Sequence, residues 1–130
     1  MTSIHPISTP RAPTPAGHYA QAVVHNGTAY VSGILPWDPD DPTAPFGDMT
    51  DQTRRVMQSL TAILEEAGSG LEHLLQVTIF VTDLEGWGAV NEVFAEFLGD
   101  HRPSRAVVPV LPLKRNAGLE LMAIAAVPSD

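Results

Sequence analysis

Residues 75–82 read Leu-Gln-Val-Thr-Ile-Phe-Val-Thr, and this short stretch decides the fold of the 130-residue chain. Every second residue in it is apolar, at Leu75, Val77, Ile79 and Val81. A period of two places alternate side chains on opposite faces of an extended chain. We therefore predict a strand here, with the odd-numbered side chains in an apolar core.

Two stretches of helical periodicity flank this strand. In the first, apolar residues repeat along one helix face, at Val56, Leu60, Ile63, Leu64 and Ala67. Asp48 or Thr50 can cap its start, and Gly68 can end it. In the second, which Asp83 can cap, one side carries Val90, Val93, Phe94, Phe97 and Leu98. Because each helix has one apolar and one polar side, we expect both to pack against a sheet.

Four more strands are predicted outside this central unit. Residues 19–24 alternate, and the pair Asn26-Gly27 that follows tolerates the positive φ angles of a tight hairpin. We expect the chain to return as a strand over residues 28–33. Two further strands are predicted near the C-terminus, at residues 105–111 and 119–127.

The predicted element order is β-β-α-β-α-β-β, which makes a single α+β domain over residues 16–130. A mixed sheet with both helices on one face is the most economical packing. The other face would carry small apolar side chains such as those of Ala22, Ala123 and Ala125. Since a bare face of this kind would be a large apolar patch in water, we expect other subunits to bury it.

The first 15 residues hold four prolines, at Pro6, Pro10, Pro13 and Pro15, and no run of apolar residues. We interpret residues 1–15 as an extended N-terminal arm, since proline removes a backbone donor and restricts its neighbours. No stretch of the chain approaches the roughly 20 apolar residues that a membrane helix needs. We therefore expect a cytoplasmic protein without a membrane partner.

Composition narrows the possible functions. Fifteen acidic and seven basic residues give a net charge of −8, which repels a polyanion, so we expect no nucleic-acid partner. The absence of cysteine excludes a thiolate nucleophile. The five histidines show no metal-ligand spacing, and no glycine-rich phosphate motif occurs. We predict neither a metal nor a cofactor.

Arg105 is the first candidate for chemistry. It follows Pro103 at the entrance to a predicted strand, where the proline restrains the backbone. A guanidinium held there can bind a carboxylate through two parallel hydrogen bonds. The alternative is that Arg105 forms a surface ion pair, which is the commoner role of an arginine at a strand entrance.

Glu120 is the second candidate, because it is the one charged residue in the otherwise apolar stretch 119–126. A carboxylate in such surroundings can exchange a proton with water or an amine. It could equally lie at a strand end and point to solvent. Tyr19 and Asn91 can orient a polar ligand through a hydroxyl and an amide, but both residue types also have common structural roles.

Several separated segments resemble those of the Rid family, the reactive-intermediate (enamine and imine) deaminases. The resemblance extends over residues 17–127. It is carried by the segments 17–22 (Gly-His-Tyr-Ala-Gln-Ala), 31–33 (Val-Ser-Gly), 52–54 (Gln-Thr-Arg), 64–68 (Leu-Glu-Glu-Ala-Gly), 81–84 (Val-Thr-Asp-Leu), 90–91 (Val-Asn), 102–105 (Arg-Pro-Ser-Arg) and 119–125 (Leu-Glu-Leu-Met-Ala-Ile-Ala). The order and spacing of the segments are specific together, although no single segment is.

The resemblance implies a chorismate-mutase-like fold assembled as a homotrimer, with a substrate pocket at each subunit interface. It implies that Arg105 binds the carboxylate of a 2-imino or 2-enamino acid, and that Glu120 positions or activates the hydrolytic water. The other pocket residues that we assign from it are Tyr19, Ser32, Gly33, Ile34, Asn91 and Val107. The implied activity is that of a hydrolase, the cofactor-free deamination of such acids to 2-oxo acids and ammonia.

Three positions depart from the family pattern. His18 stands where proline is usual, Ile34 where glutamine is common, and Met122 where a second glutamate is frequent. The last two exchanges make the neighbourhood of the pocket more apolar. Two alternatives therefore stay open: a pathway-specific enzyme for a bulkier imine or another electrophile, and a ligand-binding trimer without catalysis.

Overall fold

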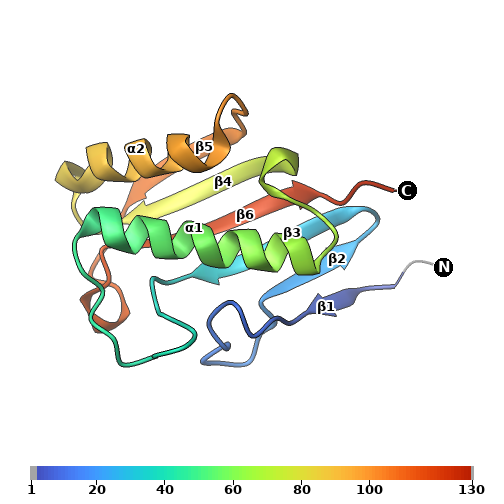
Figure 1. The fold of residues 1–130 in the computed structure, drawn as a ribbon, viewed down its shortest axis with the longest axis horizontal. Coiled ribbons are helices and arrows are strands. Elements are labelled where there is room, and N and C mark those ends of the chain that lie inside the picture. Colours follow the sequence, from blue (N-terminus) through green and yellow to red (C-terminus); the bar gives the residue numbers. More distant parts are fainter. Residues whose placement is uncertain (1–2, 130) are drawn as a thin grey trace.

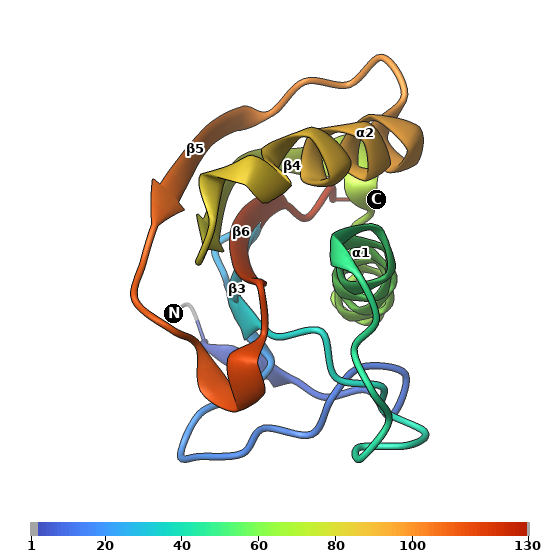
Figure 2. The ribbon, with the colours of Figure 1, turned by 90° about the vertical axis from the view of Figure 1, so that its left-hand side faces the viewer.

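The computed structural model describes residues 3–129, and Met1, Thr2 and Asp130 lie outside the described residues. It is a curved six-stranded sheet with two helices on one face (Figures 1 and 2). The strands are β1 (His5–Ile7), β2 (Ala22–His25), β3 (Thr28–Ile34), β4 (Leu74–Val81), β5 (Ser104–Pro109) and β6 (Leu119–Ala126). The helices are α1 (Met49–Glu66) and α2 (Trp87–Leu98).

The strand order is β1-β2-β3-β6-β4-β5, in which β4 and β5 are parallel and the other neighbours are antiparallel. The predicted α+β class, the mixed sheet and the placement of both helices on one face are confirmed. The predicted element order is wrong by one strand, because the described chain runs β-β-β-α-β-α-β-β. The additional strand, β1, lies in the segment predicted as an arm.

The decisive strand β4 lies inside the sheet, between β6 and β5. Val77, Ile79 and Val81 are fully buried, as their spacing predicts. Leu75 differs from the prediction, since it is 50% exposed. A register shift against β6 at the start of the strand takes Leu75 out of the alternation, and Leu74 occupies the buried position instead.

Helix α1 begins at the predicted cap. Asp48 accepts a hydrogen bond from the Asp51 N–H, and Asp51 accepts one from the Asp48 N–H, which satisfies two backbone donors reciprocally. The predicted apolar face, which includes Val56, Leu60 and Ile63, is buried against the sheet. Among the described residues, no helix is both long and apolar enough to cross a membrane.

Helix α2 begins later than predicted. Asp83 does act as a cap, but it caps a short 3-10 helix (Leu84–Gly86) by accepting from the Glu85 N–H at 2.9 Å. The α-helix itself starts at Trp87, after glycine has lowered the helix propensity of the first turn. The predicted buried side is confirmed at Val90, Val93 and Phe94.

No helix of the described chain covers the opposite face of the sheet (Figure 2). This open face carries larger apolar side chains, namely Tyr30, Phe80, Met122 and Ile124. Tyr30 and Met122 are each nearly half exposed. The prediction that small side chains form this face is wrong, because Ala22, Ala123 and Ala125 alternate onto the helix side and are buried there. The outward surface is therefore more apolar than expected, as in surfaces that other proteins bury.

The N-terminal arm is docked onto the domain. Its first part forms β1 and pairs with β2. The next part is held by the side chain of Gln21, which accepts from the Thr9 N–H at 2.7 Å and donates to the carbonyls of Thr9, Ala12 and Pro13. Gln21, Thr9 and Ala12 are all buried. The composition of the arm could not indicate this, because the group that anchors it lies in another segment.

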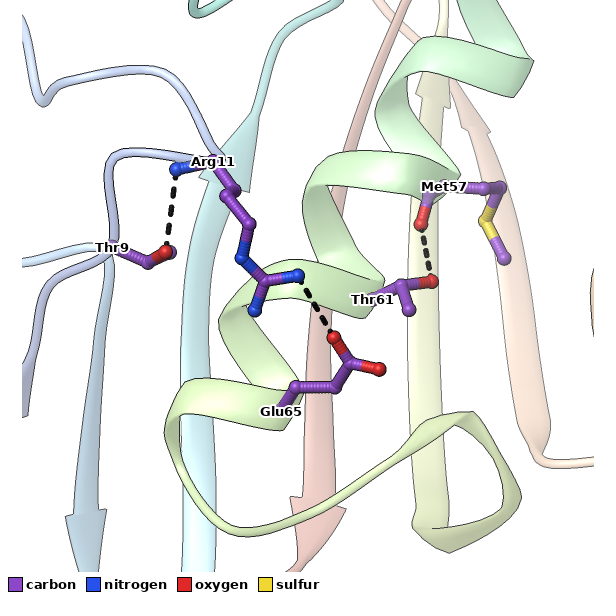
Figure 3. A network of polar contacts seen from close by, with 5 residues as sticks. All are labelled: Thr9, Arg11, Met57, Thr61 and Glu65. Carbon is purple, nitrogen blue, oxygen red and sulfur yellow. Dashed lines mark hydrogen bonds and ion pairs between the residues drawn. The ribbon is translucent and has the colours of Figure 1, made fainter.

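A second contact joins the arm to α1. The Arg11 guanidinium forms an ion pair with Glu65 at 3.0 Å, and the Arg11 backbone N–H donates to the Thr9 hydroxyl at 3.3 Å (Figure 3). Both charged side chains are more than half exposed. Exposed ion pairs contribute little to stability, so the buried hydrogen bonds of Gln21 are the main anchor.

Candidate active site

Arg105 lies on the edge strand β5 and faces the same side of the sheet as the helices. Its register partner on β4 is the buried Val77, and partner residues on neighbouring strands share a face. Arg105 itself is exposed, and it forms no ion pair with an acidic residue among residues 3–129. Within the described chain, the structure does not support the alternative of a surface ion pair.

One face of α2 holds the guanidinium of Arg105. Its Nη1 donates to Asn91 Oδ1 at 3.1 Å, and its central carbon lies 4.6 Å from the Trp87 ring centre and 5.0 Å from the Phe94 ring centre. Positions 87, 91 and 94 have the i, i+4, i+7 spacing of one helix face. We call Trp87, Asn91, Phe94 and Arg105 the α2 cluster. Its aromatic contacts restrain the arginine without neutralising its charge.

A groove of about 380 Å³ opens beside the α2 cluster. Its walls include Asn91, Phe94, Arg102, Pro103 and Arg105. A volume of this size is suited to a small molecule. Because Asn91 engages only one nitrogen of Arg105, the other N–H groups can still bind a carboxylate.

A second group of candidate residues gathers around β3. Tyr19, Ser32, Gly33 and Ile34 line a narrow pocket of about 30 Å³, to which the docked arm contributes Pro13. The Ser32 hydroxyl donates to a backbone carbonyl at 2.6 Å, so its oxygen can still accept a hydrogen bond from a ligand. Half of the Tyr19 surface is exposed. Polar groups and apolar walls are thus combined in one small pocket.

Glu120 lies next to this pocket. Its carboxylate packs so closely over Gly33 that any side chain at position 33 would collide with it. On β6, Glu120 is paired with Phe80 and is partly buried on the open face. We call Tyr19, Ser32, Gly33, Ile34 and Glu120 the β3 cluster.

The sheet separates Arg105 from Glu120 within one chain. Arg105 and Val107 both lie on the helix side, since the partner of each on β4 is buried. Glu120 faces the open side. A single chain therefore does not bring Arg105 and Glu120 into one site, although it assembles each half.

Trp87 was not predicted as a site residue, and Phe94 was predicted only as a core residue. A signal was available, because both residues share a helix face with Asn91, which was a candidate. Among residues 3–129, no three or more His, Asp or Glu side chains are grouped so that they could hold a metal ion.

The family model described as Endoribonuclease L-PSP matches residues 9–127. A RutC family protein of Pyrococcus abyssi is 39% identical over 92% of this chain and 94% of its own length. The chain belongs to the L-PSP/RutC family. The Rid resemblance is thereby confirmed, since the solved structure of a Rid family protein, YyfA of Yersinia pestis, also matches.

The agreement between this Rid protein and the solved structures covers nearly the whole chain. The YyfA structure is 33% identical and superposes with a TM-score of 0.92 over 96% of this chain and all of that one. The structure of Escherichia coli TdcF with bound serine is 34% identical, with a TM-score of 0.88 over 93% of this chain and 97% of that one. The Rid fold is therefore established for this chain.

Proposed function

We propose that this Rid protein hydrolyses reactive 2-imino and 2-enamino acids to 2-oxo acids and ammonia, without a cofactor. The observation that carries the proposal is the exposed guanidinium of Arg105, which α2 restrains and which has no acidic partner among residues 3–129. A fixed guanidinium beside a groove of small-molecule size is suited to a carboxylate. In a chain of net charge −8, a local positive site opposes the overall field, which favours a dedicated role.

The serine bound to the E. coli TdcF protein supports the same substrate class. An amino acid carries a carboxylate next to the carbon that bears nitrogen. A 2-imino acid has the same two groups, with a double bond to the nitrogen. A site that accepts the first arrangement is suited to the second.

We further propose that a second copy of the chain completes the site in a homotrimer. Arg105 lies on the edge strand β5, where another copy can approach, and Glu120 lies on the open apolar face. If the β3 cluster of one copy docks against β5 of the next, Glu120 comes to face Arg105. The same contact would cover apolar surface, and a closed ring of three leaves no copy with an unpaired interface.

The chemistry then follows from the two halves. An enamine first becomes an imine, as its carbon gains a proton and its nitrogen loses one. Arg105 holds the carboxylate and so fixes the imine carbon within reach of a water molecule. Glu120 accepts a proton from that water while the water oxygen bonds to the imine carbon. Glu120 then delivers a proton to the imine nitrogen. The carbinolamine collapses as its hydroxyl proton passes to nitrogen, its C–N bond breaks and a C=O bond forms, which releases ammonia and leaves a 2-oxo acid.

One observation bears on the alternatives. The net charge of −8 disfavours RNA, whatever the description of the family model. A small metabolite is therefore the substrate class that we propose. The location of the protein in the cytoplasm stays a prediction.

The direct test follows the release of ammonia and 2-oxo acid from freshly generated 2-iminopropionate and 2-iminobutyrate. The wild-type protein should accelerate both releases. Arg105→Ala should raise the KM, and Glu120→Gln should lower kcat by about 100-fold or more, the usual contribution of a positioned acid or base. Arg11→Ala, which removes another exposed arginine, serves as the control. Binding of 2-oxobutyrate without any turnover would instead support a non-catalytic trimer.

Mixing two inactive variants tests whether the site lies between subunits. After Arg105→Ala and Glu120→Gln are unfolded together in equal amounts and refolded, one interface in four should combine an intact Arg105 with an intact Glu120. Activity should then return to about a quarter of the wild-type value. If both residues act from the same chain, mixing should restore nothing.

A further inference from the structure

We propose that Trp87 is a positioning residue, which holds the Arg105 guanidinium in the orientation that binds the substrate carboxylate. The inference rests on the proposed function. It also gives Asn91 a different role from the one expected, since its side-chain oxygen is engaged by Arg105 rather than left for a ligand. Trp87 was not among the site residues predicted from the sequence.

The first argument is geometric. Arg105 projects from an edge strand, is exposed, and would by itself sample many rotamers, because arginine has a long flexible stem. The Trp87 ring lies 4.6 Å from the guanidinium carbon, closer than the Phe94 ring at 5.0 Å. Trp87 is also packed against the core, so the ring is a fixed platform. A guanidinium stacked on it is held in place before substrate arrives.

The second argument concerns charge. A carboxylate partner would also hold the arginine, but it would compete with the substrate carboxylate for the same N–H groups. Aromatic rings attract the cation through their quadrupole and use none of these donors. Asn91 takes one hydrogen bond from Nη1 and adds no negative charge. The α2 cluster therefore orients Arg105 and leaves its charge and most of its donors to the ligand.

The third argument is that Trp87 can be replaced at less cost to the core than Phe94. Phe94 is only 6% exposed and its loss would leave a cavity, whereas Trp87 is partly exposed at the start of α2. Phe97 offers a matched control, because it is a partly buried aromatic residue of the same helix that also packs against the core. Among the described residues, the aromatic rings that lie against the Arg105 guanidinium are those of Trp87 and Phe94, and Phe97 is not one of them.

The experiment compares Trp87→Leu, Trp87→Phe and the control Phe97→Leu in the full-length protein. The first readout is the NMR signal of the Arg105 Nε–Hε group, assigned by its loss in Arg105→Lys. Ring current should shift this signal in the wild type, and Trp87→Leu should move it towards the position of a free arginine. Trp87→Phe should keep part of the shift, and Phe97→Leu should keep all of it.

The second readout is binding of 2-oxobutyrate, measured as its inhibition constant. Trp87→Leu should weaken it about 3- to 20-fold, the range expected from losing one cation–π contact. Trp87→Phe should restore most of the affinity. In Trp87→Leu, the KM should change more than kcat. Competition by butanone, which lacks the carboxylate, should be unaffected by Trp87→Leu.

The outcomes separate the two levels of the proposal. If Arg105→Ala abolishes 2-oxobutyrate binding while Trp87→Leu leaves both the binding and the NMR signal unchanged, the positioning role is wrong and the proposed function stands. If Trp87→Leu and Phe97→Leu weaken binding equally, the effect comes from the helix and the positioning role is also wrong. If Arg105→Ala leaves binding and turnover intact, Arg105 does not bind the substrate carboxylate. The proposed function and the role of Trp87 are then both wrong.

Discussion

Gly33 and Glu120 are in direct contact, because the Glu120 carboxylate occupies the space where any other residue at position 33 would place its Cβ atom. The two come from neighbouring strands, β3 and β6, next to a register shift between them. Gly33 is not among the glycines with a positive φ angle. The position therefore requires glycine for space and not for backbone conformation.

Gly33→Ala should displace the Glu120 carboxylate and impair catalysis more than stability. The nearest atoms to the added methyl group belong to the end of a flexible side chain, which can move aside at small cost. We expect kcat to fall by at least about tenfold, since a misplaced carboxylate loses much of its acid–base contribution. Gly88→Ala is the control, because a Cβ atom there meets nothing within 4 Å. Wild-type kcat in Gly33→Ala would contradict the assigned role of Glu120.

Gln21→Leu should release the N-terminal arm. The change leaves the buried carbonyls of Thr9 and Ala12 and the Thr9 N–H without partners, so the free energy of unfolding should drop by about 2–4 kcal/mol. Denaturant unfolding measures the loss. Trypsin should also cleave after Arg11 faster than in the wild type. The matched control is Gln58→Leu, at an exposed position of α1, which should change the free energy of unfolding by less than about 0.5 kcal/mol.

Tyr30→Lys should prevent assembly without unfolding the chain. Tyr30 is 46% exposed on the open face, so a lysine there stays hydrated in an isolated subunit but would be buried in a trimer. Light scattering coupled to size exclusion should report a species near the chain mass of 13.9 kDa, with an unchanged circular dichroism spectrum. Gln58→Lys, on the outer side of α1, should leave the oligomeric mass as it is. A trimer that persists in Tyr30→Lys would mean that the open face is not the interface.

Asp48→Ala should destabilise α1 by about 1 kcal/mol, the usual cost of losing an N-cap acceptor. The carboxylate accepts from the Asp51 N–H at 2.9 Å, and alanine offers no replacement. Asp48→Asn keeps an acceptor oxygen and should recover most of the loss. The measurement is the denaturant midpoint at constant slope, and equal midpoints for Asp48→Ala and the wild type would argue against the capping box.

Much of the fold was predictable from local pattern. The alternation at residues 77–81, the helix face that includes Val56 and Leu60, and the Asn26-Gly27 hairpin are short-range features, and each is found in the structure. The docked arm was not predictable, because Gln21 reaches it across 8 to 12 residues of irregular chain. The reversal of Leu75 depends on a register shift that only pairing with β6 creates.

For the candidate site too, some features could be predicted from the sequence and others could not. The sequence by itself determined the chemistry that is available, namely a guanidinium at Arg105, a carboxylate at Glu120 and no thiolate, because residue type sets charge and reactivity. Only the tertiary structure decided that Trp87 lies against Arg105 and that the sheet stands between Arg105 and Glu120. The physical reason is that the face to which a strand residue points depends on register, and register is set by pairing between segments far apart in the chain.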